Sequence, residues 1–156
     1  SMAALSALIN YGQGDFPQEA LAAFYDKWRD NPLVVDKWFA LQAAARSTTV
    51  QTARELMTHP AFTLRTPNRA RALIFQFCLN NARGMHHPDG TGYAFWAEQV
   101  LALDALNPEI AARLARALDN WSRFVPALRT PMQPPCNACA PTKACRATCR
   151  KSYPRL

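Results

Sequence analysis

The sequence has 156 residues, of which 49% are hydrophobic, and this length is sufficient for one compact core. No run approaches the roughly 20 apolar residues that a membrane-spanning helix needs, and the N-terminus lacks a basic segment followed by an apolar signal core. Composition therefore argues against a membrane protein and predicts a soluble, cytoplasmic one.

The net charge of +7 is distributed unevenly along the chain. Residues 1–125 carry twelve basic and all eleven acidic residues, whereas residues 126–156 carry six basic residues and no acidic one. Phosphate affinity requires several clustered cations, and the main part of the chain is nearly neutral. We therefore expect no nucleic-acid partner.

The first part of the chain predicts helices over 3–10 and 17–30 and a third that starts at Asn31-Pro32. Leu21, Phe24, Tyr25 and Trp28 follow the i, i+3, i+4, i+7 spacing of a buried helical stripe. In the third helix we expect five apolar side chains to be buried: Leu33, Val34, Trp38, Phe39 and Leu41. Asp36 and Lys37 point about 100° apart on a helix, so each can meet a different neighbouring helix.

The next two helices are predicted from capping patterns. Thr48 and Gln51 have the spacing of a capping box, and His59-Pro60 ends the helix that they start. Thr66-Pro67-Asn68 then caps a helix that runs through Leu79. Cys78 within it is expected to be a small buried side chain.

Residues 84–124 predict a loop, a helix, a tight turn and a second helix. In the turn 89–92 the glycines supply unusual backbone conformations, and we expect Thr91 to accept backbone N–H groups as the first helix starts. Asn107 and Pro108 restart the chain as a helix. The apolar side chains of the pair are Phe95, Trp96, Val100, Leu101, Leu103 and Leu106, then Ile110, Leu114, Leu118 and Trp121; Arg113 and Arg116 lie off that stripe.

Short helices joined by Pro, Gly or Asn turns, with no sustained apolar/polar alternation, predict an all-α fold. Their pairing indicates stacked helical hairpins, a fragment of a HEAT- or armadillo-like superhelix.

Five segments of the sequence form a recognisable set: H-x-x-D-G-x-G-Y at 86–93, N-P-x-I-A-x-R-L at 107–114, W-x-R-F at 121–124, and the segments 33–43 and 66–74. Together they resemble the bacterial aminopeptidase N family of zinc-dependent enzymes, which remove N-terminal residues from peptides. The resemblance covers residues 3–130 and implies part of the helical C-terminal domain. Because the catalytic HExxH segment is absent, it also implies that the zinc and the catalytic residues belong to the parent enzyme's catalytic domain and that this chain alone is no enzyme and holds no cofactor.

Within the family pattern, Glu109 and Arg113 align with positions whose side chains reach toward the substrate channel. Their i, i+4 spacing places them on one helix face, where they can form a surface ion pair. Alternatively, Arg113 can hold the carboxylate at the far end of a peptide with two parallel hydrogen bonds. The family tends to have Gln at the position of Glu109, and the extra negative charge would weaken that role.

Residues 131–156 form a segment rich in proline, cysteine and basic residues, which we separate from a helical-repeat domain at 1–130. Cys136, Cys139, Cys145 and Cys149 allow a zinc site, although the spacing fits a zinc knuckle only loosely and few apolar residues could pack around a metal. Disulfides are not expected in a reducing compartment. A shifted reading frame from Pro135 is the third interpretation, because the degenerate code allows an amphipathic peptide there that resembles the family's C-terminal helix. The codons from Pro135 onward would decide it.

The three histidines, His59, His86 and His87, do not have the spacing of a metal site. We expect His86 or His87 to hydrogen-bond within the loop before Asp89.

Two function classes follow. The first is a non-catalytic domain that shapes the substrate chamber of an aminopeptidase, with the parent's catalytic domain as partner and peptides as substrates. The second is a free-standing helical scaffold that binds a protein partner. Without its covering domain, the first would expose an apolar face and self-associate.

Overall fold

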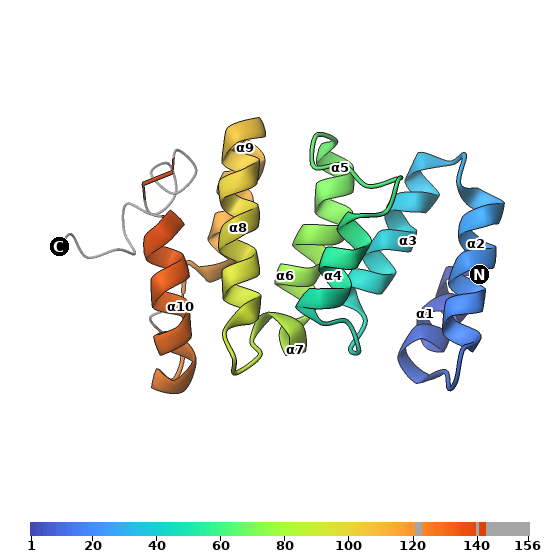
Figure 1. The fold of residues 1–156 in the computed structure, drawn as a ribbon, viewed down its shortest axis with the longest axis horizontal. Coiled ribbons are helices and arrows are strands. Elements are labelled where there is room, and N and C mark those ends of the chain that lie inside the picture. The colour runs from blue at the N-terminus through green and yellow to red at the C-terminus, as the bar shows by residue number, and fades with distance from the viewer. Residues whose placement is uncertain (121–122, 140, 143–156) are drawn as a thin grey trace. The chain divides into compact units, whose positions relative to one another are not determined.

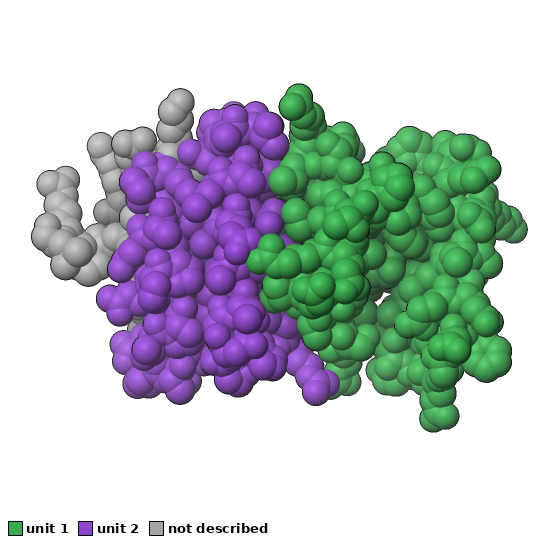
Figure 2. Space-filling view, in the orientation of Figure 1, with its two compact units in different colours: residues 1–81 green, residues 82–156 purple. Residues whose placement is uncertain are grey.

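The computed structural model describes residues 1–120, 123–139, 141 and 142. All regular elements in these ranges are helical, which confirms the predicted all-α class (Figure 1). The chain divides into two compact units, residues 1–81 and residues 82–156 (Figure 2). None of the described helices is long and apolar enough to cross a membrane.

Unit 1 begins with four helices: α1 (Met2–Tyr11), α2 (Phe16–Trp28), α3 (Pro32–Ala44) and α4 (Val50–Met57). α1 packs against α2, and α2 packs against α3. The predicted start of α3 is confirmed, because Asn31 Oδ1 accepts the backbone N–H of Val34 and Pro32 occupies the first turn. The cap of α4 lies one residue later than predicted, since Thr49 rather than Thr48 accepts the N–H of Thr52.

The rest of unit 1 is one helical segment made of α5 (Pro67–Ala70), the π-turn η1 (Arg71–Phe75) and α6 (Gln76–Asn80). All three parts pack against α3, and η1 also packs against α4. A π-turn widens the helix and shifts its register, and residues 72–75 are all buried here. The predicted helix is confirmed, but Thr66 makes no side-chain capping bond.

Two side chains of unit 1 connect neighbouring segments by donating hydrogen bonds to backbone carbonyls. Trp38 Nε1 on α3 donates to the Leu21 carbonyl on α2 at 3.0 Å. Asn81 Nδ2 lies 3.0–3.1 Å from the carbonyl oxygens of Ala43, Ala45 and Thr48, which belong to the end of α3 and the turn before α4. Asn81 is buried, so these bonds satisfy its side-chain amide in the absence of water.

Unit 2 contains α7 (Ala82–Met85), α8 (Thr91–Leu106), α9 (Pro108–Ala115), the 3₁₀ turn η2 (Arg116–Leu118) and α10 (Pro126–Cys139). α8 is the central helix and packs against α7, α9 and α10. Its apolar core is formed by Tyr93, Phe95, Trp96, Val100, Leu103, Leu114 and Met132.

The start of α8 depends on Asp89 and two glycines. Asp89 Oδ1 accepts the backbone N–H of Thr91 at 2.9 Å and its hydroxyl at 2.6 Å, so the acceptor is Asp89, and the predicted role of Thr91 is wrong. Gly90 has φ 75°, in the left-handed region that glycine tolerates best. A Cβ on Gly92 would lie 2.2 Å from the Met85 carbonyl oxygen, so only glycine fits there.

α10 runs through position 130/131, where the sequence predicts a domain boundary. That boundary remains a prediction. Pro131, Pro134 and Pro135 lie inside this helix, and each removes one backbone donor. Met132, Cys136 and Cys139 are nevertheless buried on it. The predictions for residues 143–156 and for Trp121 lie outside the described residues.

Four predicted core residues are exposed: Trp28 is 39%, Leu33 67%, Leu101 44% and Leu106 46% exposed. Trp28 is the last residue of α2. On α3 the buried residue is Val35, two positions after Leu33, and on α8 it is Val100, which directly precedes Leu101. Leu106 is the last residue of α8, beyond the buried Leu103. Successive helical residues point about 100° apart, so one stripe cannot bury all of them.

Candidate functional site

The predicted channel residues Glu109 and Arg113 lie on α9, one turn apart, and both are exposed. The opposite face of this helix is buried through Ile110, Ala111 and Leu114. The burial of that face therefore holds both charged side chains toward solvent.

Both ends of α9 are fixed by specific hydrogen bonds. At its start, Asn107 Oδ1 accepts the backbone N–H of Ile110 at 3.2 Å, which confirms the predicted cap. At its end, the buried Trp96 Nε1 on α8 donates to the Leu114 carbonyl at 2.9 Å. Because Arg113 immediately precedes Leu114, its backbone is held rigidly relative to α8.

Within the described residues, Glu109 and Arg113 form no ion pair with each other or with another side chain. The neighbouring Arg116 is engaged, since its Nε lies 3.7 Å from Asp119 Oδ2. The Arg113 guanidinium can thus donate hydrogen bonds to a carboxylate without first breaking another ion pair. Glu109, one turn away, supplies a competing negative charge.

The two histidines before α8 make hydrogen bonds. His87 Nδ1 accepts the backbone N–H of Asp89 at 3.4 Å, which confirms the predicted bond within the loop, and it also lies 3.0 Å from Asp89 Oδ1. His86 Nδ1 instead lies 2.9 Å from the Tyr93 hydroxyl on α8. Burial lowers the pKa of His86 and raises that of Tyr93. Hydrogen bonds from Thr91, with a smaller contribution from His87, lower the pKa of Asp89.

Three cysteines lie in the described residues, and all three are buried: Cys78, Cys136 and Cys139. Burial raises the pKa of the Cys78 thiol well above its ordinary range, which makes it a poor nucleophile. Cys139 Sγ lies 3.7 Å from the Ala97 carbonyl oxygen. The described ranges contain no cluster of three or more His, Cys, Asp or Glu side chains suited to a metal. Cys145 and Cys149 lie outside those ranges, so the zinc alternative stays a prediction.

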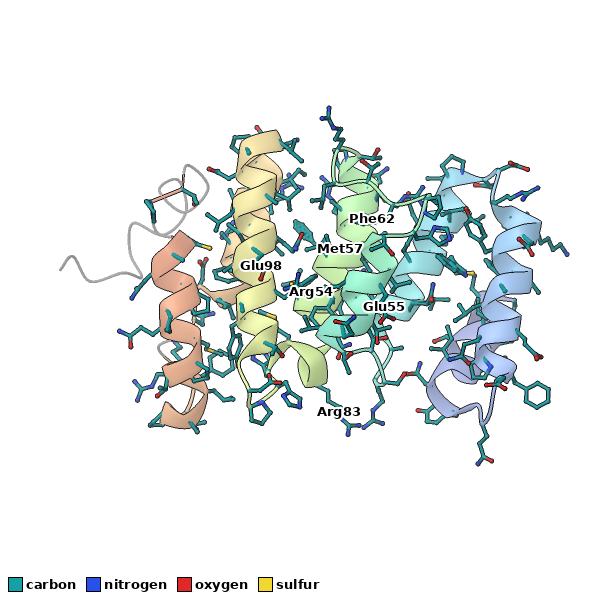
Figure 3. The ribbon with its side chains drawn as sticks, in the orientation of Figure 1. Arg54, Glu55, Met57, Phe62, Arg83 and Glu98 are labelled. Carbon is teal, nitrogen blue, oxygen red and sulfur yellow. The ribbon has the colours of Figure 1, made fainter. Side chains whose placement is uncertain are left out.

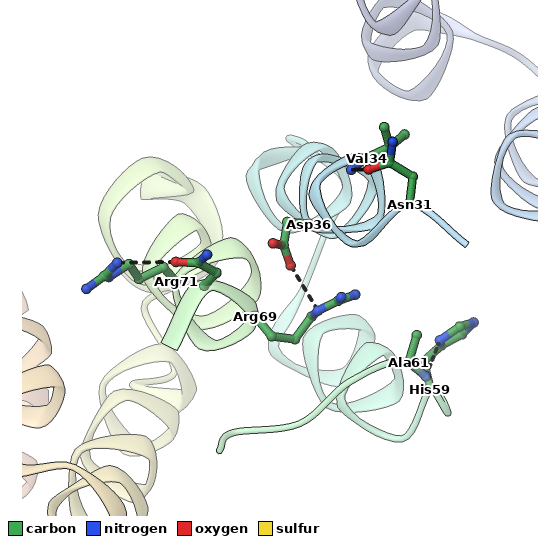
Figure 4. Close-up of polar contacts among 8 residues, drawn as sticks. Asn31, Val34, Asp36, His59, Ala61, Arg69 and Arg71 are labelled. Atoms are coloured by element: carbon green, nitrogen blue, oxygen red, sulfur yellow. Dashed lines mark hydrogen bonds and ion pairs between the residues drawn. The ribbon is translucent and has the colours of Figure 1, made fainter. Parts of the chain in front are cut away.

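A polar cluster in unit 1 was not predicted as a site. Asp36 Oδ1 on α3 lies 2.9 Å from Arg69 Nε on α5, with both side chains mostly buried (Figure 4). The contact is an ion pair without hydrogen-bond geometry, and Arg69 Nη1 is buried with no hydrogen-bond partner among the described residues. The guanidinium carbon lies 5.3 Å from the centre of the Phe39 ring. The sequence indicated only that Asp36 can meet another helix, which is confirmed.

The same cluster includes His59 and the aromatic side chains around it. Phe39 also contacts Phe62, which follows α4 in the chain, with ring centroids 5.8 Å apart. α4 itself carries Arg54, Glu55 and Met57 (Figure 3). An apolar spacing pattern does not reveal such a cluster, because its members come from four separate segments.

A family model described as a domain of unknown function (DUF3458_C) with ARM repeats matches residues 1–141. The chain is 44% identical over 117 residues to aminopeptidase N of Caulobacter vibrioides, covering 74% of this chain and 14% of that protein. It is 41% identical over 127 residues to aminopeptidase N of Escherichia coli K12, covering 80% of this chain and 14% of that protein. The chain thus spans about one seventh of the length of these relatives.

Among solved structures, the chain is similar to Legionella pneumophila aminopeptidase A in complex with aspartic acid. The TM-score is 0.84 at 29% identity, over 94% of this chain and 17% of that one. These similarities confirm the resemblance seen in the sequence motifs.

Proposed function

The chain belongs to the DUF3458_C family of ARM-repeat domains and corresponds to the C-terminal domain of bacterial aminopeptidase N; on this premise we propose that it shapes the chamber through which peptides reach the catalytic site. Its partner is the catalytic domain of the parent enzyme, which supplies the zinc ion and the hydrolytic residues. The absence of an HExxH segment from the sequence supports this division of roles. We further propose that the parent enzyme is cytoplasmic.

The observation that carries the proposal is the exposed Arg113 on the rigidly held helix α9. A guanidinium is always charged and matches a carboxylate with two parallel hydrogen bonds. A peptide entering the chamber ends in a carboxylate, whereas a short amide substrate lacks one. Arg113 would therefore orient peptides and leave amide substrates unaffected.

The test is Arg113→Ala in the full-length parent enzyme. We expect kcat/KM to fall for peptides that end in a free carboxylate, by about tenfold for the loss of one charge-assisted pair of hydrogen bonds. For alanyl or leucyl amides kcat/KM should not change. Arg116→Ala is the matched control, because Arg116 is also exposed, lies one turn away and is paired with Asp119.

A kcat/KM of Arg113→Ala that is unchanged from the wild-type value for both peptides and short amides would contradict the channel role. Hydrolysis of leucyl amides by the isolated chain would contradict the assignment of catalysis to another domain.

The exposed apolar side chains of unit 1 support the proposal that another protein domain covers this unit. Tyr11 is 77%, Phe16 70% and Leu33 67% exposed. Apolar surface that lies open on an isolated domain favours association with another protein surface. We propose that the parent's catalytic domain covers these three side chains and that the isolated chain self-associates. A monomer at every concentration in light scattering would contradict the self-association.

A further inference from the structure

His59 connects the loop after α4 to three aromatic side chains of α2 and α3. Its ring centroid lies 4.7 Å from that of Tyr25, 5.1 Å from that of Trp38 and 5.6 Å from that of Phe39. Its Nδ1 accepts the backbone N–H of Ala61 at 3.1 Å (Figure 4). One imidazole thus fixes its own loop and joins it to two helices.

The hydrogen bond requires the neutral form of the imidazole, because a protonated Nδ1 becomes a donor and cannot accept the Ala61 N–H. Protonation would therefore break the bond that shapes the loop.

The charges around His59 also oppose protonation. Arg69, from α5, lies over the same Phe39 ring that His59 contacts. Asp36, from α3, is in contact with Arg69 and is therefore already engaged by a positive charge. Tyr25, from α2, is a neutral phenol that meets the imidazole edge to face. A cation on His59 would thus compete with Arg69 for the Phe39 ring.

We propose that His59 is an acid-sensitive latch, which holds the loop of residues 58–66 against α2 and α3 when neutral and releases it when protonated. The released loop connects α4 to the segment that carries Arg69, so opening also loosens the Asp36–Arg69 contact.

The direction of the pH dependence follows from the surroundings of the imidazole. Burial, and to a lesser extent Arg69, lower the pKa of His59 below 6.5, its value when unfolded. The closed loop therefore binds fewer protons than the open one at mildly acidic pH. Its stability is complete above about pH 6.5 and is lost as the pH falls through the lower pKa of the closed state.

The test is hydrogen exchange of the Ala61 amide in the full chain between about pH 7.5 and pH 5, corrected for the intrinsic exchange rate. In the wild-type chain the opening constant should rise by up to about tenfold per pH unit between the two pKa values of His59. In His59→Asn it should be independent of pH, because the amide oxygen of Asn can accept the same N–H without titrating. His86→Asn is the control, since its histidine belongs to unit 2, and it should keep the wild-type pH dependence.

A flat opening constant in the wild-type chain, or an unchanged pH dependence in His59→Asn, would overturn the latch. If the Asn variant does not fold, NMR titration of His59 in the wild-type chain decides the matter. A midpoint below 6.5 supports the latch, and one at or above 6.5 overturns it.

Discussion

The two units of the chain differ in the kind of polar group that they bury. In unit 1, the interior between α3 and the 67–80 segment contains the Asp36–Arg69 ion pair and the Asn81 side chain. In the described part of unit 2 the buried polar side chains are the neutral Gln99 and Thr142, and the Trp96 side chain on α8 donates to a carbonyl of α9, while the charged Glu109 and Arg113 remain exposed. Charges inside one unit therefore hold its helices together, and charges outside the other are available to a ligand.

This difference separates stability from function. Removing one member of a buried ion pair leaves a desolvated charge, whereas removing an exposed charge costs little. Substitutions in unit 1 should consequently act on folding, and substitutions on the exposed face of α9 should act on the parent enzyme.

The largest effect is expected for Asp36→Ala, which leaves the buried Arg69 without its counter-ion. We expect a loss of about 3–5 kcal/mol in the free energy of unfolding, measured by urea denaturation. Lys37→Ala, at the adjacent exposed position, should change it by less than about 0.5 kcal/mol. Equal losses in the free energy of unfolding of the two variants would show that the Asp36–Arg69 pair does not stabilise unit 1.

Gly92→Ala should cost about 3 kcal/mol, at the upper end of overpacking effects, because its Cβ would meet the backbone carbonyls of Met85 and Gly84. Backbone atoms cannot rotate away as a side chain can, so the turn before α8 must shift. Thermal unfolding provides the measurement, with Ala94→Ser on the exposed side of α8 as the control. An unchanged melting temperature in Gly92→Ala would mean that the turn is looser than its geometry indicates.

The helices themselves could largely be predicted from local signals. Asn31-Pro32 and Asn107-Pro108 are strong signals for the start of a helix, because the capping Asn and the first-turn Pro lie within one turn. Both helix starts are confirmed. Spacing could not identify Leu101 as exposed, since its neighbours on α8 are equally apolar. The π-turn at 71–75 has no local signal either, because it reflects packing against α3 and α4.

The candidate site was predictable only to the extent that it depends on local spacing. The exposure of Arg113 follows from the stripe on α9, but its role depends on surfaces outside this chain. The cluster of Asp36, His59 and Arg69 was not predicted as a unit, because its members belong to α3, to the loop after α4 and to α5, which meet only through tertiary packing.

Trp96→Phe should cost about 2 kcal/mol, because it removes the buried indole N–H that donates to the Leu114 carbonyl. Trp38→Phe is the matched variant in unit 1, where the bond to the Leu21 carbonyl is only partly buried. Water can replace that donor, so we expect a loss of about 1 kcal/mol. Denaturant unfolding of both variants gives the comparison, and a larger loss for Trp38→Phe would contradict it.

Arg113→Ala should have the smallest effect on folding, within about 0.5 kcal/mol of the wild-type chain by urea denaturation. The side chain is exposed, and its removal leaves no buried group unpaired. A loss of more than about 1 kcal/mol would assign Arg113 to the stability of α9 rather than to a ligand.

A double-mutant cycle between Glu109 and Arg113 in the full-length parent enzyme tests the channel role most directly, because effects on folding cancel in it. The readout is kcat/KM for a peptide with a free carboxylate. Glu109→Gln should raise it several-fold when Arg113 is present, by removing a competing negative charge. In the Arg113→Ala background the same substitution should have at most a small effect, because the guanidinium with which Glu109 competes is gone. An equal effect of Glu109→Gln in both backgrounds would show that the pair does not act on the substrate together and would contradict the account.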